Sequence, residues 1–117
     1  MALDPLNTLR DEIRTFSAER NWQQFHTPKN LVMALSVEIS ELMEHFQWLT
    51  PEQSTMLDTN ERGEVAQELA DVFIYLVRLS DVLGVDLAAA AQEKLLLNAE
   101  KYPVEKAKGL ATKYTKL

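Results

Sequence analysis

Apolar side chains recur every three to four residues along most of the chain, which is the pattern of amphipathic α-helices. Four such stretches cover residues 5–20, the segment from residue 28 to residue 46, residues 65–83 and residues 87–102. The chain has only three glycines and four prolines, so it offers little material for β-hairpin turns. We therefore expect an all-α fold, organised as a four-helix bundle.

Capping residues mark the ends of these helices. Side chains that favour the N-cap position precede three of them, at Asp4, Thr27 and Asp86. Pro5 and Pro28 stand at the first helical position of two helices, where proline is well tolerated. Gly84 is expected to end the third helix, and Pro103 the fourth. The polar residues 50–60 are predicted to form a loop, in which one short helical turn is left open.

The second and third helices are apolar over a wider stripe than one neighbouring helix covers. Leu31, Leu35 and Ile39 lie on one face of the second helix, and Val65, Leu69 and further leucines follow on the third. Burial by a second copy of the chain is the simplest way to remove this surface from water. We therefore expect a homo-oligomer.

Length and charge restrict the function further. A chain of 117 residues predicts a single domain, residues 1–117. Its 18 acidic residues against 12 basic ones give a net charge of −6, which disfavours binding of a nucleic-acid duplex. The charge is uneven, because residues 101–117 carry five lysines and one glutamate, which leaves −10 for the first 100 residues. Residues 104–117 therefore form a basic tail, and the sequence leaves open whether this tail is flexible.

The absence of cysteine excludes a disulfide, a thiolate zinc site and a thiol nucleophile. It fits a reducing cytoplasm, which is the expected location. No stretch approaches the roughly 18 apolar residues of a membrane span. We expect a soluble protein without a membrane partner.

Four carboxylates occur in two matching pairs, Glu38 with Glu41 and Glu68 with Asp71. A spacing of three residues places both members of a pair on one side of a helix. Glu38 also lies at the edge of the apolar stripe, so its helix directs acid toward the core side. Exposed acidic helix faces are common, but two matching pairs favour a functional site.

Carboxylates gathered in a partly buried place are costly unless they protonate or bind cations. Oxygen ligands without cysteine or histidine favour a hard cation, Mg²⁺ with Mn²⁺ as a substitute. A di-iron site needs histidine three residues after glutamate on two helices, and His45 lies four residues after Glu41. Mg²⁺ would leave coordination positions open for phosphate oxygens.

The two acidic pairs, separated by 26 residues and followed by Val72-Phe73-Ile74-Tyr75-Leu76, resemble the signature of the MazG-like all-α nucleoside triphosphate pyrophosphohydrolases. Further segments are similar to the dCTP pyrophosphatase branch of that family in particular. These are Trp22-Gln23-Gln24-Phe25-His26, Pro28-x-Asn30-Leu31, Phe46-Gln47-Trp48 and Lys94-x-x-x-Asn98-x-x-Lys101-Tyr102-Pro103. The resemblance covers nearly the whole chain.

The resemblance implies a hydrolase that cleaves a deoxynucleoside triphosphate into a monophosphate and pyrophosphate in nucleotide-pool housekeeping. It implies Mg²⁺ bound by Glu38, Glu41, Glu68 and Asp71, with Glu41 as the candidate general base. It assigns the base pocket to Trp22, His26 and Trp48. It assigns phosphate and sugar contacts to Asn30, Tyr75, Lys94, Asn98, Lys101 and Tyr102. It also implies a dimer, or a tetramer built as a dimer of dimers.

Several alternatives stay open. Some dCTP-directed relatives carry a histidine in the first helix where this chain has Ile13, so dATP or a broad range of dNTPs competes with dCTP or a modified dCTP. A related pyrophosphohydrolase that acts on phosphoribosyl-nucleotides uses similar acids but does not need a pocket formed by Trp22 and Trp48. A non-catalytic helical interaction module, with the acids on a solvated face, is the alternative from another class.

Overall fold

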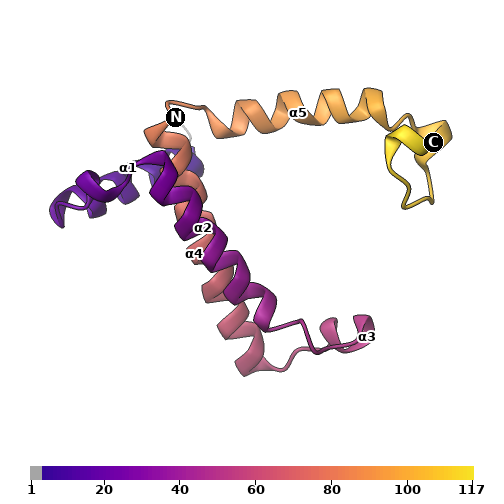
Figure 1. Cartoon of the computed structure of the whole chain (residues 1–117), viewed down its shortest axis with the longest axis horizontal. Coiled ribbons are helices and arrows are strands. Elements are labelled where there is room, and N and C mark those ends of the chain that lie inside the picture. The colour runs from indigo at the N-terminus through magenta and orange to yellow at the C-terminus, as the bar shows by residue number, and fades with distance from the viewer. Residues whose placement is uncertain (1–3) are drawn as a thin grey trace. The chain divides into compact units, whose positions relative to one another are not determined.

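The computed structural model describes residues 4–117, and this part of the chain is helical without any strand (Figure 1). The all-α prediction is confirmed. The chain divides into two compact units, one ending at Val85 and the other comprising Asp86–Leu117. Among the described residues, no helix has the length and apolar character needed to cross a membrane.

The first unit is built around an antiparallel pair of long helices. Its elements are α1 (Pro5–Glu19), η1 (Gln23–Phe25), α2 (Pro28–Glu44), α3 (Pro51–Ser54) and α4 (Thr59–Val82). Helices α2 and α4 lie side by side, and α1 packs against α4 (Figure 1). This pairing brings the two acidic motifs onto neighbouring helices.

The predicted N-caps Asp4 and Thr27 are confirmed by their hydrogen bonds, although α2 ends at Glu44 and not at the predicted Phe46. The Asp4 carboxylate accepts from the backbone N–H of Leu6 at 3.0 Å, and the Thr27 hydroxyl accepts from that of Asn30 at 3.2 Å. Both side chains satisfy backbone donors that a helix leaves unpaired at its start. Helix α4 ends before Gly84, whose φ of +69° is the left-handed conformation that glycine adopts without strain.

Residues 51–54 form the single helical turn α3, which the sequence had left open within the polar stretch 50–60. The Thr50 hydroxyl accepts from the backbone N–H of Gln53 at 3.1 Å, and the Gln53 side chain accepts from that of Thr50 at 3.0 Å. This reciprocal capping box, with Pro51 at the first position, stabilises the turn. Asp58 then caps α4, which begins at Thr59.

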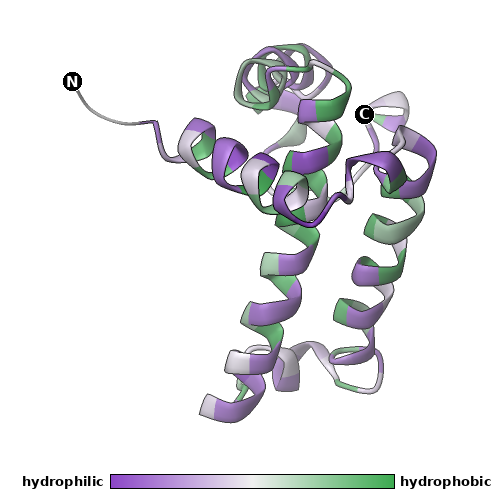
Figure 2. Ribbon diagram, turned by 90° about the vertical axis from the view of Figure 1, so that its left-hand side faces the viewer, coloured by the Kyte–Doolittle hydropathy of each residue, from purple (hydrophilic) through white to green (hydrophobic). Residues whose placement is uncertain are grey.

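The first unit buries few large apolar side chains. The buried ones are Ile13, Leu31, Val65 and Val77. Helix α2 leaves Val32, Met33, Val37, Ile39 and Met43 exposed, and α4 leaves Leu69 and Phe73 exposed. Apolar and polar positions therefore both reach the surface of these helices (Figure 2). The wide apolar surface expected from the sequence is present on the single chain.

The second unit contains α5 (Leu87–Lys101), α6 (Val104–Ala107) and η2 (Tyr114–Lys116). Asp86 caps α5 as predicted, its carboxylate accepting from the backbone N–H of Ala89 at 3.0 Å. The basic tail folds back on the end of α5, since the rings of Tyr102 and Tyr114 meet edge to face with centroids 5.8 Å apart. The Lys101 ammonium lies 5.0 Å from the centre of the Tyr114 ring.

Candidate functional site

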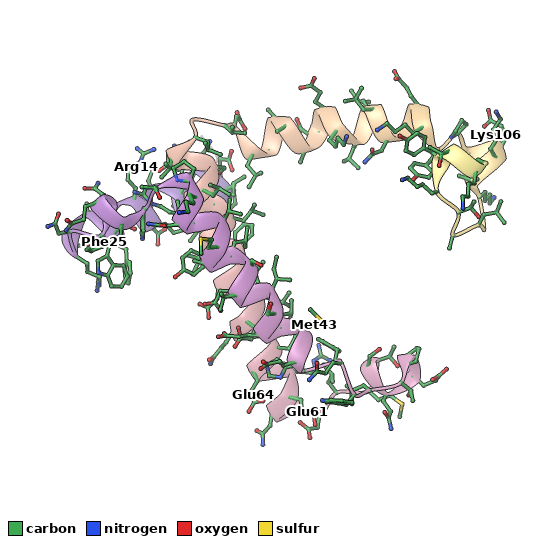
Figure 3. All side chains as sticks on the ribbon, in the orientation of Figure 1. Arg14, Phe25, Met43, Glu61, Glu64 and Lys106 are labelled. Atoms are coloured by element: carbon green, nitrogen blue, oxygen red, sulfur yellow. The ribbon has the colours of Figure 1, made fainter. Side chains whose placement is uncertain are left out.

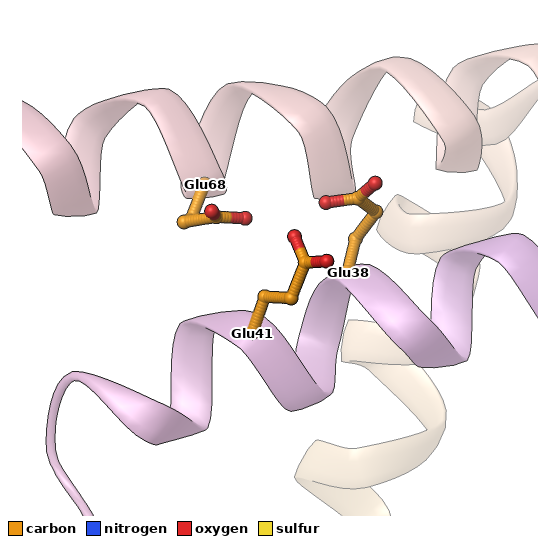
Figure 4. A group of neighbouring side chains, drawn as sticks. All are labelled: Glu38, Glu41 and Glu68. Atoms are coloured by element: carbon orange, nitrogen blue, oxygen red, sulfur yellow. The ribbon is translucent and has the colours of Figure 1, made fainter.

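Three carboxylates from α2 and α4 converge in the first unit. Glu38, Glu41 and Glu68 each offer an oxygen atom within 4.8 Å of the others' (Figure 4). The glutamates of α2 stand one helical turn apart, and Glu68 faces them from α4. The structure thus brings together three of the four residues that we predicted as metal ligands.

Asp71, the fourth predicted ligand, lies one turn after Glu68 on α4. It is outside the group of three converging oxygens, but its charge is close enough to contribute to the raised pKa of Glu38. Asp71 also lines a cleft of the first unit, described below. It therefore joins the acidic cluster to that cleft.

The cluster is electrostatically uncompensated. Burial raises the pKa of Glu38 to about 7, helped by the hydrogen bond and charge of Glu41 and by the charges of Asp71 and Glu68. Burial, and next the charge of Glu41, raise the pKa of Glu68 as well. One oxygen of Glu38 and one of Glu68 are buried without a hydrogen-bond partner.

No lysine, arginine or histidine of residues 4–117 forms an ion pair with these carboxylates. Buried carboxylate oxygens without donors need a cation or a proton to offset lost hydration. The donor set consists of oxygens alone, which suits a hard divalent cation. These residues could therefore hold a metal ion.

A cleft of about 400 Å³ lies between α1, the segment around η1, and α4. Two predicted base-binding residues, Trp22 and His26, line it together with Asp71 and Tyr75. Its other lining residues are Leu9, Glu12, Ile13, Phe16, Ser17, Ile74 and Arg78. Its volume is in the range of small-molecule sites, and Asp71, one turn after Glu68, lies on its wall.

A second cleft of about 370 Å³ shares Trp22, His26 and Tyr75 with the first and adds Asn30. The Asn30 side-chain amide donates to the Phe25 carbonyl at 3.0 Å. Asn30 therefore fixes the short η1 turn that precedes His26. Its predicted contact with substrate stays a prediction.

An ion network behind His26 was missed by sequence reasoning. Arg78 is only 7% exposed, and its Nε donates to His26 Nδ1 at 3.0 Å. Its Nη1 donates to Asp81 at 3.3 Å, and Asp81 also accepts two hydrogen bonds from Arg14, at 2.9 and 2.6 Å. The only sequence signal was an arginine within an apolar helical stretch, three residues before an aspartate.

Trp48 lies apart from the other predicted base-binding residues. It follows the C-terminal end of α2 and is 86% exposed, whereas Trp22 precedes the N-terminal end. The 17 residues of α2 span about 25 Å, so the two indoles of one chain do not share a cleft. Figure 3 locates these ends, with Met43 near one and Phe25 near the other.

The remaining predicted contacts belong to the second unit. Lys94, Asn98 and Lys101 are spaced by four and three residues along α5, so they share one side of that helix. Tyr102 follows the helix, and its backbone N–H donates to the Asn98 carbonyl at 2.9 Å. Their roles as phosphate or sugar contacts stay predictions.

Comparisons with known proteins bear on this arrangement. The model of the MazG-like family matches residues 33–117. The chain is 42% identical to dCTP pyrophosphatase 1 of Rattus norvegicus and 41% identical to that of Homo sapiens. Each of these matches covers 99% of this chain and 71% of the relative. A crystal structure of a pyrophosphatase from Archaeoglobus fulgidus superposes with a TM-score of 0.83 at 38% identity, covering 88% of this chain and 96% of that one. The chain belongs to the MazG-like family.

Proposed function

We propose that the protein is a hydrolase that cleaves dCTP, or a modified dCTP, to the monophosphate and pyrophosphate. The observation that carries the proposal is the meeting of two features in one unit. An uncompensated carboxylate cluster lies on α2 and α4, and its neighbour Asp71 lines an aromatic cleft with Trp22 and His26. Relatives that align with nearly the whole chain are dCTP pyrophosphatases. The role would be housekeeping of the cytoplasmic nucleotide pool.

The cofactor that we propose is Mg²⁺, with Mn²⁺ as a substitute. Glu38, Glu41, Glu68 and Asp71 would hold it, since hard cations take carboxylate oxygens and the buried oxygens of Glu38 and Glu68 have no donor. Bound Mg²⁺ would offset the charge of the triphosphate and lower the pKa of a coordinated water. The chain's own contribution is to hold four acids in register on two paired helices.

Glu41 is our candidate for the general base, because its carboxylate stands between those of Glu38 and Glu68 (Figure 4). It would accept the proton of the attacking water at one carboxylate oxygen. Glu41→Gln keeps the size of the side chain but removes this acceptor, so kcat should fall by about 100-fold or more. Glu44→Gln, one turn further along α2, is the matched control and should keep normal turnover. Normal kcat in Glu41→Gln with unchanged metal affinity would place the base elsewhere.

The cleft would receive the nucleobase. Trp22 offers a flat ring for stacking, and His26 offers a hydrogen-bonding edge. Tyr75, on the same wall, would contact the phosphate or sugar. In the second unit, Lys94 and Lys101 would contact phosphate, while Asn98 and Tyr102 would direct hydrogen bonds to phosphate or sugar. The family resemblance is the basis for these roles of α5 and of Tyr102, which follows it.

We also propose a homo-oligomer, a dimer or a tetramer made of two dimers. The exposed apolar residues of α2 and α4 would be covered by a second copy. Trp48 would then reach a base pocket only in a neighbouring subunit, because α2 separates it from Trp22 of its own chain. The oligomeric state can be measured by light scattering.

A dATP-directed or broad dNTP hydrolase is the second candidate, favoured by the apolar Ile13 on the wall of the cleft. The deciding assay measures phosphate release from each of the four dNTPs, with Mg²⁺ or Mn²⁺ and added inorganic pyrophosphatase. Turnover highest with dCTP supports the first proposal, and turnover highest with dATP supports the second. Turnover of no dNTP or NTP with either metal would leave a non-catalytic interaction module.

A further inference from the structure

The buried Arg78 lines the cleft and has no part in the proposed chemistry. Its guanidinium is held on two sides, by His26 at 3.0 Å and by Asp81 at 3.3 Å. Asp81 is in turn held by the fork of Arg14 from α1. This chain of contacts fixes the direction in which Arg78 meets the imidazole.

A guanidinium can donate hydrogen bonds but cannot accept them. The ring nitrogen that Arg78 contacts, His26 Nδ1, must therefore be unprotonated. A neutral imidazole carries its single hydrogen on the other nitrogen, so Nε2 is a donor. Burial, and then the Arg78 charge, also lower the pKa of His26, which favours this neutral form.

We infer that Arg78 is a positioning residue that fixes His26 as a hydrogen-bond donor and thereby selects bases whose ring nitrogen at the pairing edge is an acceptor. This inference rests on the proposed function. Cytosine presents the acceptor N3 beside its amino group, whereas uracil presents an N3–H donor. A histidine whose Nε2 is held as a donor can bond to N3 of cytosine. It disfavours uracil, because its N–H would face the N3–H of uracil and leave a buried polar group unpaired. A histidine free to exchange its hydrogen between nitrogens could accept from uracil instead.

The first test is the imidazole ¹⁵N NMR spectrum of the nucleotide-free protein. We expect His26 to be protonated at Nε2 and bare at Nδ1. The chain has two histidines, so His45 is the internal reference, and a His26→Gln variant assigns the signals. A protonated Nδ1 in His26 would overturn the inference, whether or not the protein hydrolyses any nucleotide.

The second test compares kcat/KM for dCTP and dUTP in Arg78→Met. Methionine keeps a long side chain but lacks the guanidinium that makes both hydrogen bonds. We expect the preference for dCTP over dUTP to fall by about tenfold. KM for dCTP should rise more than kcat falls, because a base contact is the same before and during phosphoryl transfer. Arg78→Lys keeps one charged donor and should restore part of the preference. Arg62→Met, on the same helix and outside the network, should change neither value.

An unchanged dCTP preference in a folded Arg78→Met protein would overturn the inference. If that variant does not fold, as judged by circular dichroism, Arg78→Lys and the wild-type NMR spectrum decide. If the wild-type protein turns over no dNTP, the proposed function fails, while the position of the His26 hydrogen is still measured.

Discussion

Replacing Glu38 by glutamine should stabilise the metal-free protein and abolish its response to metal. One Glu38 oxygen is buried without a donor, and Glu41 and Glu68 lie within reach of the same point. Burial and these neighbours raise the pKa of Glu38 from an ordinary 4.5 to about 7. Glutamine keeps the shape of the side chain, carries no charge and can donate from its amide.

The sign of the pH dependence follows from this shift. The folded protein holds the Glu38 proton more tightly than the unfolded chain does, so the carboxyl group favours folding most below about pH 4.5. Its contribution to the free energy of unfolding becomes less favourable as the pH rises from 4.5 to about 7, and above that pH it is unfavourable. A shift of this size corresponds to about 3 kcal/mol at full desolvation. Glu38 is partly exposed, so solvent screening reduces the expected penalty to about 1–2 kcal/mol.

The assay is urea unfolding at fixed protein concentration in EDTA, at pH 5 and pH 8. Glu38→Gln should exceed the wild type in free energy of unfolding by about 1–2 kcal/mol at pH 8, and the difference should be smaller at pH 5. Millimolar Mg²⁺ should stabilise the wild type and leave Glu38→Gln unchanged. Glu44→Gln serves as the control and should follow the wild type throughout. A metal-free Glu38→Gln protein less stable than the wild type at pH 8 would refute the electrostatic argument.

Three further predictions concern the apolar core, the ion network of Asp81 and the binding of nucleotide. Leu31 is 1% exposed, so Leu31→Ala should lower the free energy of unfolding by about 2–5 kcal/mol. A loss below about 1 kcal/mol in urea unfolding would contradict its place in the core. The hydrogen bond from Arg14 lowers the pKa of Asp81, so Asp81→Asn should lose about 1–2 kcal/mol at pH 7. That loss should shrink as the pH falls through the lowered pKa, and a loss independent of pH would exclude the carboxylate as its cause. Mg²⁺ with a non-hydrolysable dCTP analogue should raise Tm in a thermal scan more than either does alone, and unchanged Tm values would contradict a nucleotide site.

The sequence pattern was most informative where the controlling interactions are local. The caps at Asp4 and Thr27 and the stop at Gly84 depend on residues within one helical turn, so spacing alone predicts them. The acidic pairs were also predictable, because a three-residue spacing places two carboxylates on one helical face whatever the fold. Their meeting needed only that α2 and α4 pack side by side.

Features that depend on distant residues could not be derived in this way. Arg78 and His26 are 52 positions apart, and periodicity alone treats position 78 as part of an apolar helix. The family resemblance placed Trp48 and Trp22 in one base pocket, but the length of α2 keeps them apart in one chain. The turn α3 could be left open but not predicted, although Thr50 and Gln53 carried its signal, since a four-residue helix has no hydrophobic periodicity to detect.

One face of α4 connects the proposed metal ligands with the cleft proposed for the base. Glu68, Asp71, Tyr75 and Arg78 follow one another at spacings of three, four and three residues. At about 100° per residue these positions form one stripe along the helix. The stripe begins at the acidic cluster, and its last three members line the cleft that also holds His26. A rigid helix therefore fixes the distance between the proposed metal ligands and the group that reads the base. Because the same helix sets both, binding of the correct base can place the triphosphate against the acids without any movement of the first unit's backbone.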